Sequence, residues 1–168
     1  MYFKELYKEN LNINENFTYK IIVIGDSGVG KSNFINRFFG KGFKPNSIST
    51  VGVELSSKIY EAMYTKGNTS CCDIIRVNVW DTAGQERYKS VASSYYKGSN
   101  GVFILYDTTK YNTFENVDNW ISDTNLFCNL NTSIMLVGTK SDLYDLKVIE
   151  YSLLEEKAER YGNNINTI

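Results

Sequence analysis

The residues with the clearest capacity for chemistry form a glycine-rich segment near the start of the chain. Residues 25–32 read Gly-Asp-Ser-Gly-Val-Gly-Lys-Ser and match the phosphate-loop pattern G-x-x-x-x-G-K-[ST]. Glycines let consecutive backbone N–H groups converge on phosphate oxygens, while Lys31 can reach the outer phosphates and Ser32 can bind Mg²⁺. A plain glycine-rich turn is the alternative, but the strand pattern before the segment and the helix pattern after it favour phosphate binding. The residues expected to contact the nucleotide from this segment are Ser27, Gly28, Val29, Gly30, Lys31, Ser32 and Asn33.

A second candidate segment, residues 81–86, reads Asp-Thr-Ala-Gly-Gln-Glu and follows a strand pattern that ends at Trp80. Asp81, at the end of a strand beside a phosphate loop, is placed to hold Mg²⁺, usually through water. Gly84 would permit close approach of the backbone to a terminal phosphate, and Gln85 could orient an attacking water. The alternative is an acidic turn at the end of a strand with no role in binding. The presence of a phosphate-loop motif in the same chain makes this alternative less favoured.

Strand and helix patterns alternate along the chain and would position both segments. Strands separated by crossover helices predict an α/β fold of the P-loop NTPase type, with a mostly parallel central sheet and helices on both faces. Turn signals between two of the strands predict an antiparallel hairpin at one edge, with residues 61–72 as a solvated loop. The expected strands cover 19–24, 51–60, 73–80, 101–106, 133–137 and 164–168, and the expected helices cover 33–39, 113–123 and 153–161.

Composition narrows the classes of function. The 168 residues suit one domain, and 18 Lys+Arg against 19 Asp+Glu argue against a nucleic-acid binder held by a basic surface. The absence of histidine excludes His-based catalysis and His metal sites. The three cysteines have no metal-site or disulfide spacing, and the N-terminus lacks a secretory pattern, so we expect an intracellular, cytoplasmic protein. Apolar runs are shorter than a membrane-spanning helix needs.

Taken together, GDSGVGKS at 25–32 and WDTAGQE at 80–86 resemble the Ras superfamily of small GTPases, most closely its Rab family. The resemblance covers the chain from about Tyr19 to its end. It implies a Ras-like G domain that binds GTP, GDP and Mg²⁺, hydrolyses GTP slowly as a molecular switch, and serves vesicle or membrane trafficking. The segments that carry the Rab resemblance are STVGVE at 49–54, ERYKSVASSYYKG at 86–98 and GVFILYDTT at 101–109.

The resemblance also assigns roles to single residues. Thr50 matches the threonine of the first switch, which senses Mg²⁺ and the γ-phosphate in the triphosphate state. Phe43 matches the aromatic residue that packs edge-on against the guanine, Gln85 matches the catalytic glutamine, and Gly84 belongs to the same γ-phosphate-sensing motif. The metal-binding residues that the resemblance implies are Ser32, Thr50 and Asp81.

Base recognition is expected at Thr139-Lys140-Ser141-Asp142, which follows a strand pattern and resembles the T-K-x-D form of the family's N-K-x-D motif. Asp142 would accept hydrogen bonds from the guanine N1–H and 2-amino group, which adenine does not offer. Polar discrimination of this kind can reach a factor of about 10⁴. The Lys140 stem would lie over the base. A simple turn is the alternative for so short a motif.

The implied partners are an exchange factor, a GTPase-activating protein and effectors that bind the switch regions near 43–55 and 81–98. A monomer is expected, without nucleic acid as a partner. Three hydrophobic residues fall where Rab proteins face their effectors, although ordinary core packing would also explain the last two: Leu55, Trp80 and Tyr95.

The sequence departs from the family pattern at the hairpin of residues 61–72, which is longer than in typical Rab proteins, and at its C-terminal end. The sequence stops at NNINTI, where the family continues with an S-A-K loop at the guanine, a closing helix and a tail with prenylated cysteines. We therefore expect residues 17–168 to form a G domain that lacks the last base-binding loop, the C-terminal closing helix and a visible lipid anchor. Residues 1–16 form an N-terminal extension. Within it, residues 1–11 show helical spacing of apolar side chains, and one interpretation is a helix that helps cover the bared apolar face. A frayed polar extension, as at most termini, is the interpretation that we favour.

Two functions from different classes stay open. The first is a Rab-like GTPase switch, and the second is a truncated or degenerate GTPase-fold interaction module with weak or no hydrolysis. Intact Lys31, Thr50 and Gln85 favour the switch. A P-loop kinase is a more distant alternative, and Asp142 argues against its adenine preference.

Overall fold

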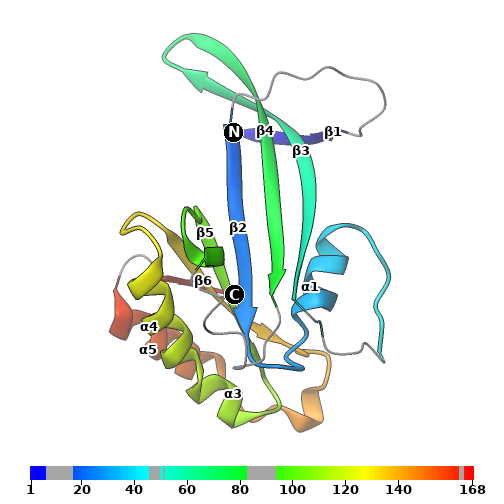
Figure 1. The fold of residues 1–168 in the computed structure, drawn as a ribbon, viewed down its shortest axis with the longest axis vertical. Coiled ribbons are helices and arrows are strands. Elements are labelled where there is room, and N and C mark those ends of the chain that lie inside the picture. The colour runs from blue at the N-terminus through cyan, green and yellow to red at the C-terminus, as the bar shows by residue number, and fades with distance from the viewer. Residues whose placement is uncertain (7–16, 46–49, 51, 83–93, 163–164) are drawn as a thin grey trace.

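The structure is a computed structural model that describes residues 1–6, 17–45, 50, 52–82, 94–162 and 165–168. Within these residues, seven strands form one sheet in the order β1-β3-β4-β2-β5-β6-β7 (Figure 1). The strands are β1 (Tyr2–Leu6), β2 (Phe17–Gly25), β3 (Val53–Lys66), β4 (Thr69–Thr82), β5 (Gly101–Asp107), β6 (Ser133–Thr139) and β7 (Ile165–Thr167). The helices are α1 (Lys31–Phe38), α3 (Tyr111–Glu115), α4 (Val117–Phe127) and α5 (Tyr151–Tyr161), with a 3-10 helix η2 (Tyr144–Leu146).

The centre of the sheet is parallel. β2 lies between β4 and β5, and β6 and β7 continue the parallel order. β3 pairs antiparallel with β4, and β1 pairs antiparallel with β3 at the outer edge. Residues 22–24 of β2 are buried in succession, as expected for a central strand covered on both faces. The predicted α/β class, with a mostly parallel sheet and an antiparallel edge, is confirmed.

Alternate side chains of the central strands enter two separate cores. Ile22 and Ile24 of β2 join the core under α3, α4 and α5, whereas Val23 joins the core under α1. The first core is the larger one and includes fully buried Val117 and Ile121 of α4. On the α1 side, several hydrophobic side chains are only partly buried: Ile21, Phe103 and Met135. The two cores fix the central strands, and thereby the loops that leave their carboxyl ends.

The C-terminal region carries a helix that packs on the sheet. α5 covers the residues for which a helix was predicted, and its Leu154 and Ala158 are buried in the larger core. It precedes β7, which pairs with β6. A helix is therefore present near the C-terminus, on the face of the sheet that α3 and α4 also cover. It is the helix predicted over 153–161, and the closing helix of the family was expected after it, beyond β7. None of the described helices is long and apolar enough to cross a membrane.

The hairpin of β3 and β4 is longer than predicted. Residues 61–72, expected as a solvated loop, continue the strand pairing as far as Lys66 opposite Thr69. Only Gly67 and Asn68 connect the strands, and Gly67 has a φ of 62°. A glycine with positive φ at the first central position suits a two-residue turn whose twist matches the strands. The loop prediction was wrong because the turn chemistry is confined to these two residues.

The N-terminal segment is a strand, where one interpretation of the sequence was a helix. Tyr2 pairs with Met63 and Leu6 pairs with Ile59, so β1 extends the edge of the sheet (Figure 1). Met1, Tyr2 and Phe3 stay 84%, 59% and 54% exposed. The interpretation as a helix covering the apolar face is therefore wrong for Tyr2–Leu6, and residues 7–11 lie outside the described part of the chain. The edge of β3 offers backbone N–H and C=O groups, and their pairing favours a strand over the helical pattern.

Candidate functional site

The glycine-rich loop connects β2 to α1 at the carboxyl end of the central strands. Gly25 has a φ of 137°, and a Cβ there would lie 2.2 Å from the Leu105 carbonyl oxygen, so β2 can approach β5 only with glycine at this position. Gly30 has a φ of 103° and precedes α1, whose N-terminus has no side-chain cap. The first N–H groups of α1 are therefore open to an anion at the loop.

Lys31 lies over the loop rather than in solvent. Its side chain is buried, and Nζ donates to the carbonyl oxygens of Gly25 and Asp26, at 2.8 Å each. Burial lowers the pKa of Lys31 to about 8, and the charges of Asp81 and Asp26 partly oppose that shift. The ammonium group is thus held at the loop. A phosphate oxygen there could accept from it as a third partner, beside the two carbonyl oxygens.

Three oxygen-bearing side chains meet beside the loop, and they are the three predicted to bind the metal. Ser32 Oγ and Thr50 Oγ1 lie 2.9 Å apart. Asp81, at the end of β4, is only 5% exposed, and its Oδ1 has no hydrogen-bond partner among the described residues. Burial raises the pKa of Asp81, while a hydrogen bond with Ser32 and the charge of Lys31 oppose the rise. A buried, unpartnered carboxylate oxygen beside two hydroxyl groups fits Mg²⁺, which takes oxygen ligands.

The expected base-recognition turn begins where β6 ends. Thr139 Oγ1 lies 2.6 Å from the carbonyl oxygen of Val29 and 2.8 Å from that of Tyr106. Lys140 has a φ of 59°, and its Nζ donates to Oδ2 of the buried Asp107 at 2.5 Å. Burial alone would raise the pKa of Asp107, but hydrogen bonds from Lys140 and Thr109 hold it below its usual value. The start of this turn is therefore bonded both to the phosphate loop and to the end of β5.

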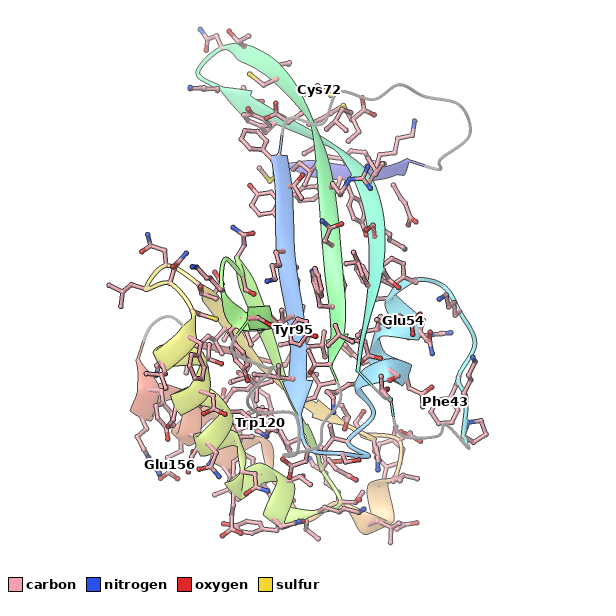
Figure 2. All side chains as sticks on the ribbon, viewed as in Figure 1. Phe43, Glu54, Cys72, Tyr95, Trp120 and Glu156 are labelled. Carbon is pink, nitrogen blue, oxygen red and sulfur yellow. The ribbon has the colours of Figure 1, made fainter. Side chains whose placement is uncertain are left out.

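The remaining residues predicted at the base are exposed. Asp142 lies in the exposed turn after Lys140, and Phe43 is 74% exposed on the segment that follows α1 (Figure 2). Asn33 holds that segment: its amide donates to the Lys44 carbonyl and accepts from the Lys44 N–H, both at 3.0 Å. Sequence reasoning had treated Asn33 only as a nucleotide contact, and no local pattern signals its bonds eleven residues along the chain.

The three hydrophobic residues predicted to face effectors share one region. Leu55 on β3 is directly opposite Trp80 on β4, so their side chains point to the same face. The ring centroids of Trp80 and Tyr95 lie 6.0 Å apart, and Tyr95 is labelled in Figure 2. Leu55 is half exposed, whereas Trp80 and Tyr95 are partly buried. Leu55 is therefore open to a partner, whereas Trp80 and Tyr95 pack against each other and are only partly accessible. The role of these residues in effector binding stays a prediction.

Two predicted residues, Gly84 and Gln85, lie outside the described part of the chain. The structure describes β4 up to Thr82, whose hydroxyl donates to the Val23 carbonyl at 2.8 Å. This bond ties the end of β4 to β2, the strand that leads into the phosphate loop. The roles of Gly84 and Gln85 stay predictions.

A contact that sequence reasoning missed joins the phosphate loop to the helices. Asp26 Oδ2 accepts from Asn116 Nδ2 at 2.7 Å, and Asp26 Oδ1 accepts from Trp120 Nε1 at 2.9 Å. Trp120, on α4, is labelled in Figure 2 near the carboxyl end of β2. The partners are 90 and 94 residues apart in sequence, so no local spacing could have indicated them.

Comparisons with known proteins agree with this geometry. The family model described as the Ras family matches residues 20–167. Ras-related protein YPTC6 of Chlamydomonas reinhardtii is 42% identical over 87% of this chain and 64% of its own length. Ras-related protein RABA1h of Arabidopsis thaliana is 40% identical over 86% of this chain and 62% of its own length. GTP-binding protein ypt1 of Schizosaccharomyces pombe is 38% identical over 89% of this chain and 70% of its own length.

These relatives are of the Rab type, and the predicted resemblance is confirmed. The chain spans 62% and 64% of the length of two of these relatives, so their activities as whole proteins do not pass to it directly. The family match nevertheless covers the phosphate loop, the metal-site residues and the base-recognition turn. The chain therefore belongs to the Ras family, as a Rab-like small GTPase.

Proposed function

We propose that this protein is a switch that binds GDP and GTP with Mg²⁺ and hydrolyses GTP slowly. The observation that carries the proposal is the meeting of Ser32, Thr50 and the unpartnered Asp81 Oδ1 beside the phosphate loop. A buried carboxylate oxygen without a partner is costly unless a cation or a donor completes it. A magnesium nucleotide at the loop supplies that cation.

Lys31, the start of α1 and three oxygen-bearing side chains would have separate parts in binding. The open N–H groups at the start of α1 and the Lys31 ammonium group hold phosphate oxygens. Ser32, Thr50 and Asp81 would hold Mg²⁺, which, when bound, neutralises negative charge on the phosphates. Thr50 belongs to the first switch, and its place depends on whether a terminal phosphate is present.

Hydrolysis needs a positioned water, and we assign this role to Gln85. The assignment rests on the family motif that contains it. A glutamine orients water without taking its proton, so the chain's own rate would be slow unless a partner supplies an arginine. An activating protein of that kind belongs to the proposal.

Selection of guanine is assigned to Asp142. The bond from Lys140 to Asp107 holds the start of the turn that presents Asp142, and Thr139 joins the same turn to Val29 in the phosphate loop. The proposed base site and phosphate site would thereby be joined by hydrogen bonds. Phe43, held through the bonds between Asn33 and Lys44, would flank the base from the other side.

We further propose that the protein acts in vesicle or membrane trafficking, in the cytoplasm and on endomembranes through its partners. The Rab-type names of the relatives support this. Exchange factors, activating proteins and effectors would bind the segments near 43–55 and 81–98. Leu55, Trp80 and Tyr95 would form the hydrophobic part of the effector surface.

Nucleotide identity and metal dependence test the proposal directly. The purified protein is denatured, and the released nucleotide is identified and counted by chromatography. We expect close to one guanine nucleotide per chain, released faster when EDTA removes Mg²⁺. Lys31→Ala should reduce the bound nucleotide strongly, whereas Lys66→Ala, an exposed lysine on the distant hairpin, should not. Wild-type protein that is empty and does not bind added GDP would instead indicate an interaction module.

A further inference from the structure

The second residue of the phosphate loop, Asp26, carries a negative charge next to the expected phosphate site. Its backbone carbonyl accepts from Lys31 Nζ, but its carboxylate points elsewhere. One carboxylate oxygen accepts from the Asn116 amide and the other from the Trp120 indole. Both oxygens are thus engaged by neutral donors outside the loop.

These donors come from one helical turn that is fixed in the larger core. Asn116 immediately precedes α4, and the backbone N–H of Trp120 donates to the Asn116 carbonyl at 3.2 Å. Side chains four residues apart lie on the same helix face, so both reach the same carboxylate. Val117 and Ile121, which directly follow the two donors in the sequence, are fully buried. The turn that holds Asp26 therefore has little freedom to move relative to β2.

The identity of the donors matters for the charge balance at the loop. A lysine or arginine at either position would bring a second cation near the phosphate site. Asn116 and Trp120 instead fix the carboxylate without adding charge. A released Asp26 side chain could turn to Lys31, five residues along the loop, and compete with phosphate for its ammonium group.

We propose that Asn116 and Trp120 are positioning residues that clamp the Asp26 carboxylate onto α4, keep it from Lys31, and so hold the phosphate loop ready for the nucleotide's phosphates. The inference rests on the proposed function, because the phosphates of GDP and GTP are the ligand that the clamp serves. The residues of the clamp, Asp26, Asn116 and Trp120, act through the loop and through Lys31 rather than on the base.

The test measures GDP affinity by displacement of a fluorescent GDP analogue in excess Mg²⁺. Trp120→Phe keeps an aromatic ring but removes the donor, and Asn116→Ala removes the other donor. A hydrogen bond to a charged group supports a loss of about tenfold or more in affinity for each variant. Asn119→Ala, on an exposed position of the same helix, is the matched control and should bind like wild type.

A double-mutant cycle separates clamping from packing. In an Asp26→Ala background there is no carboxylate to clamp, so adding Trp120→Phe should change GDP affinity by less than about twofold. Equal losses from Trp120→Phe in both backgrounds would show that Trp120 only packs, and would overturn the inference. The indole N–H signal of Trp120 in NMR spectra should also move in the Asp26→Ala protein, with or without nucleotide.

The outcomes distinguish the two proposals. Normal GDP binding by wild type, together with unchanged binding by Trp120→Phe and Asn116→Ala, would overturn the clamp and leave the proposed function intact. Wild-type protein that binds no guanine nucleotide would overturn the proposed function, and the clamp's role in phosphate binding with it. Weaker binding by both single variants, with no added loss in the Asp26→Ala background, supports the clamp.

Discussion

At the carboxyl ends of β2, β5 and β6, polar side chains are buried and bonded to the backbone, whereas the far ends of β3 and β4 form an exposed ribbon (Figure 1). At the first end, Lys31 and Thr139 each contact two carbonyl oxygens, and Asp107 is fully buried with several donors. At the ribbon end, strand pairing supplies most of the order. β1 adds to it by pairing with β3.

The two ends depend on different kinds of interaction: hydrogen bonds of particular buried side chains at the first, and backbone pairing between strands at the second. A buried polar side chain loses its hydrogen bond when its partner moves, so the nucleotide end tolerates few changes. Backbone pairing on the ribbon is insensitive to most side chains, so the ribbon tolerates many. Substitutions at the first end should therefore change nucleotide affinity or hydrolysis. Substitutions at the ribbon end should cause only small losses in the free energy of unfolding.

The largest effect is expected from Asp142→Asn. If Asp142 accepts two guanine hydrogen bonds as proposed, the change replaces that acceptor by a group that can also donate, so the preference for GDP over xanthosine diphosphate should fall by about 10⁴. Displacement assays with GDP, ADP and xanthosine diphosphate measure it. Asp145→Asn, at an exposed position of η2 three residues along, serves as the control and should leave the preference unchanged. ATP competing as well as GTP against the wild-type protein would refute the assignment of Asp142.

A smaller effect, confined to the chemical step, is expected from Gln85→Leu. Hydrolysis of bound GTP should slow by about tenfold or more in single turnover, because the variant cannot orient the attacking water. GDP affinity should stay nearly the same, since the side chain does not contribute to the ground state. Unchanged hydrolysis, both alone and with an activating protein, would remove Gln85 from the mechanism.

The sequence predicted the position of the glycine-rich loop between a strand and a helix, for a physical reason. The phosphate loop is a local motif: its glycines, lysine and serine are contiguous, and their geometry follows from the strand before and the helix after. The buried strands were equally readable, because a continuous apolar run such as 22–24, bounded by a glycine-rich turn, is typical of a strand covered on both faces. Bonds between distant residues, such as that of Trp120 with Asp26, left no trace in local spacing.

The ribbon end was predicted less well because its pattern is ambiguous. Residues 61–72 contain glycine, asparagine and serine, which indicate turns, yet only Gly67 and Asn68 form one. The apolar residues of the N-terminus satisfy helical spacing, while strand pairing with β3 decides the outcome. On an exposed edge, side-chain burial does little to favour a helix over a strand. Backbone pairing with the neighbouring strand therefore decides between them.

Deleting residues 1–6 should test how independent the two ends are. β1 leaves Met1, Tyr2 and Phe3 more than half exposed, so its loss removes little apolar burial, and we expect about 1–2 kcal/mol of destabilisation. For a chain of this size, that corresponds to a melting temperature lower by about 2–8 °C. GDP affinity should stay within about twofold of wild type. A large loss of affinity on deletion would show that the ribbon end and the nucleotide end are coupled.

The smallest effect is expected from Glu5→Gln, which tests a single side-chain link between β1 and the rest of the molecule. Lys58 Nζ lies 2.9 Å from Glu5 Oε2 and also donates to the Phe38 carbonyl at the end of α1. Since Lys58 keeps that carbonyl and the nearby rings of Phe38 and Phe39, loss of the partly exposed ion pair should cost at most about 1 kcal/mol. The melting temperature should fall by no more than about 4 °C, and by less in high salt, where the pair is screened. Lys4→Gln, on the adjacent position of the same strand, changes a charge without reaching Lys58 and serves as the control. α1 begins in the phosphate loop, so a change in GDP affinity in Glu5→Gln but not in Lys4→Gln would show that the ribbon end acts on the nucleotide through α1.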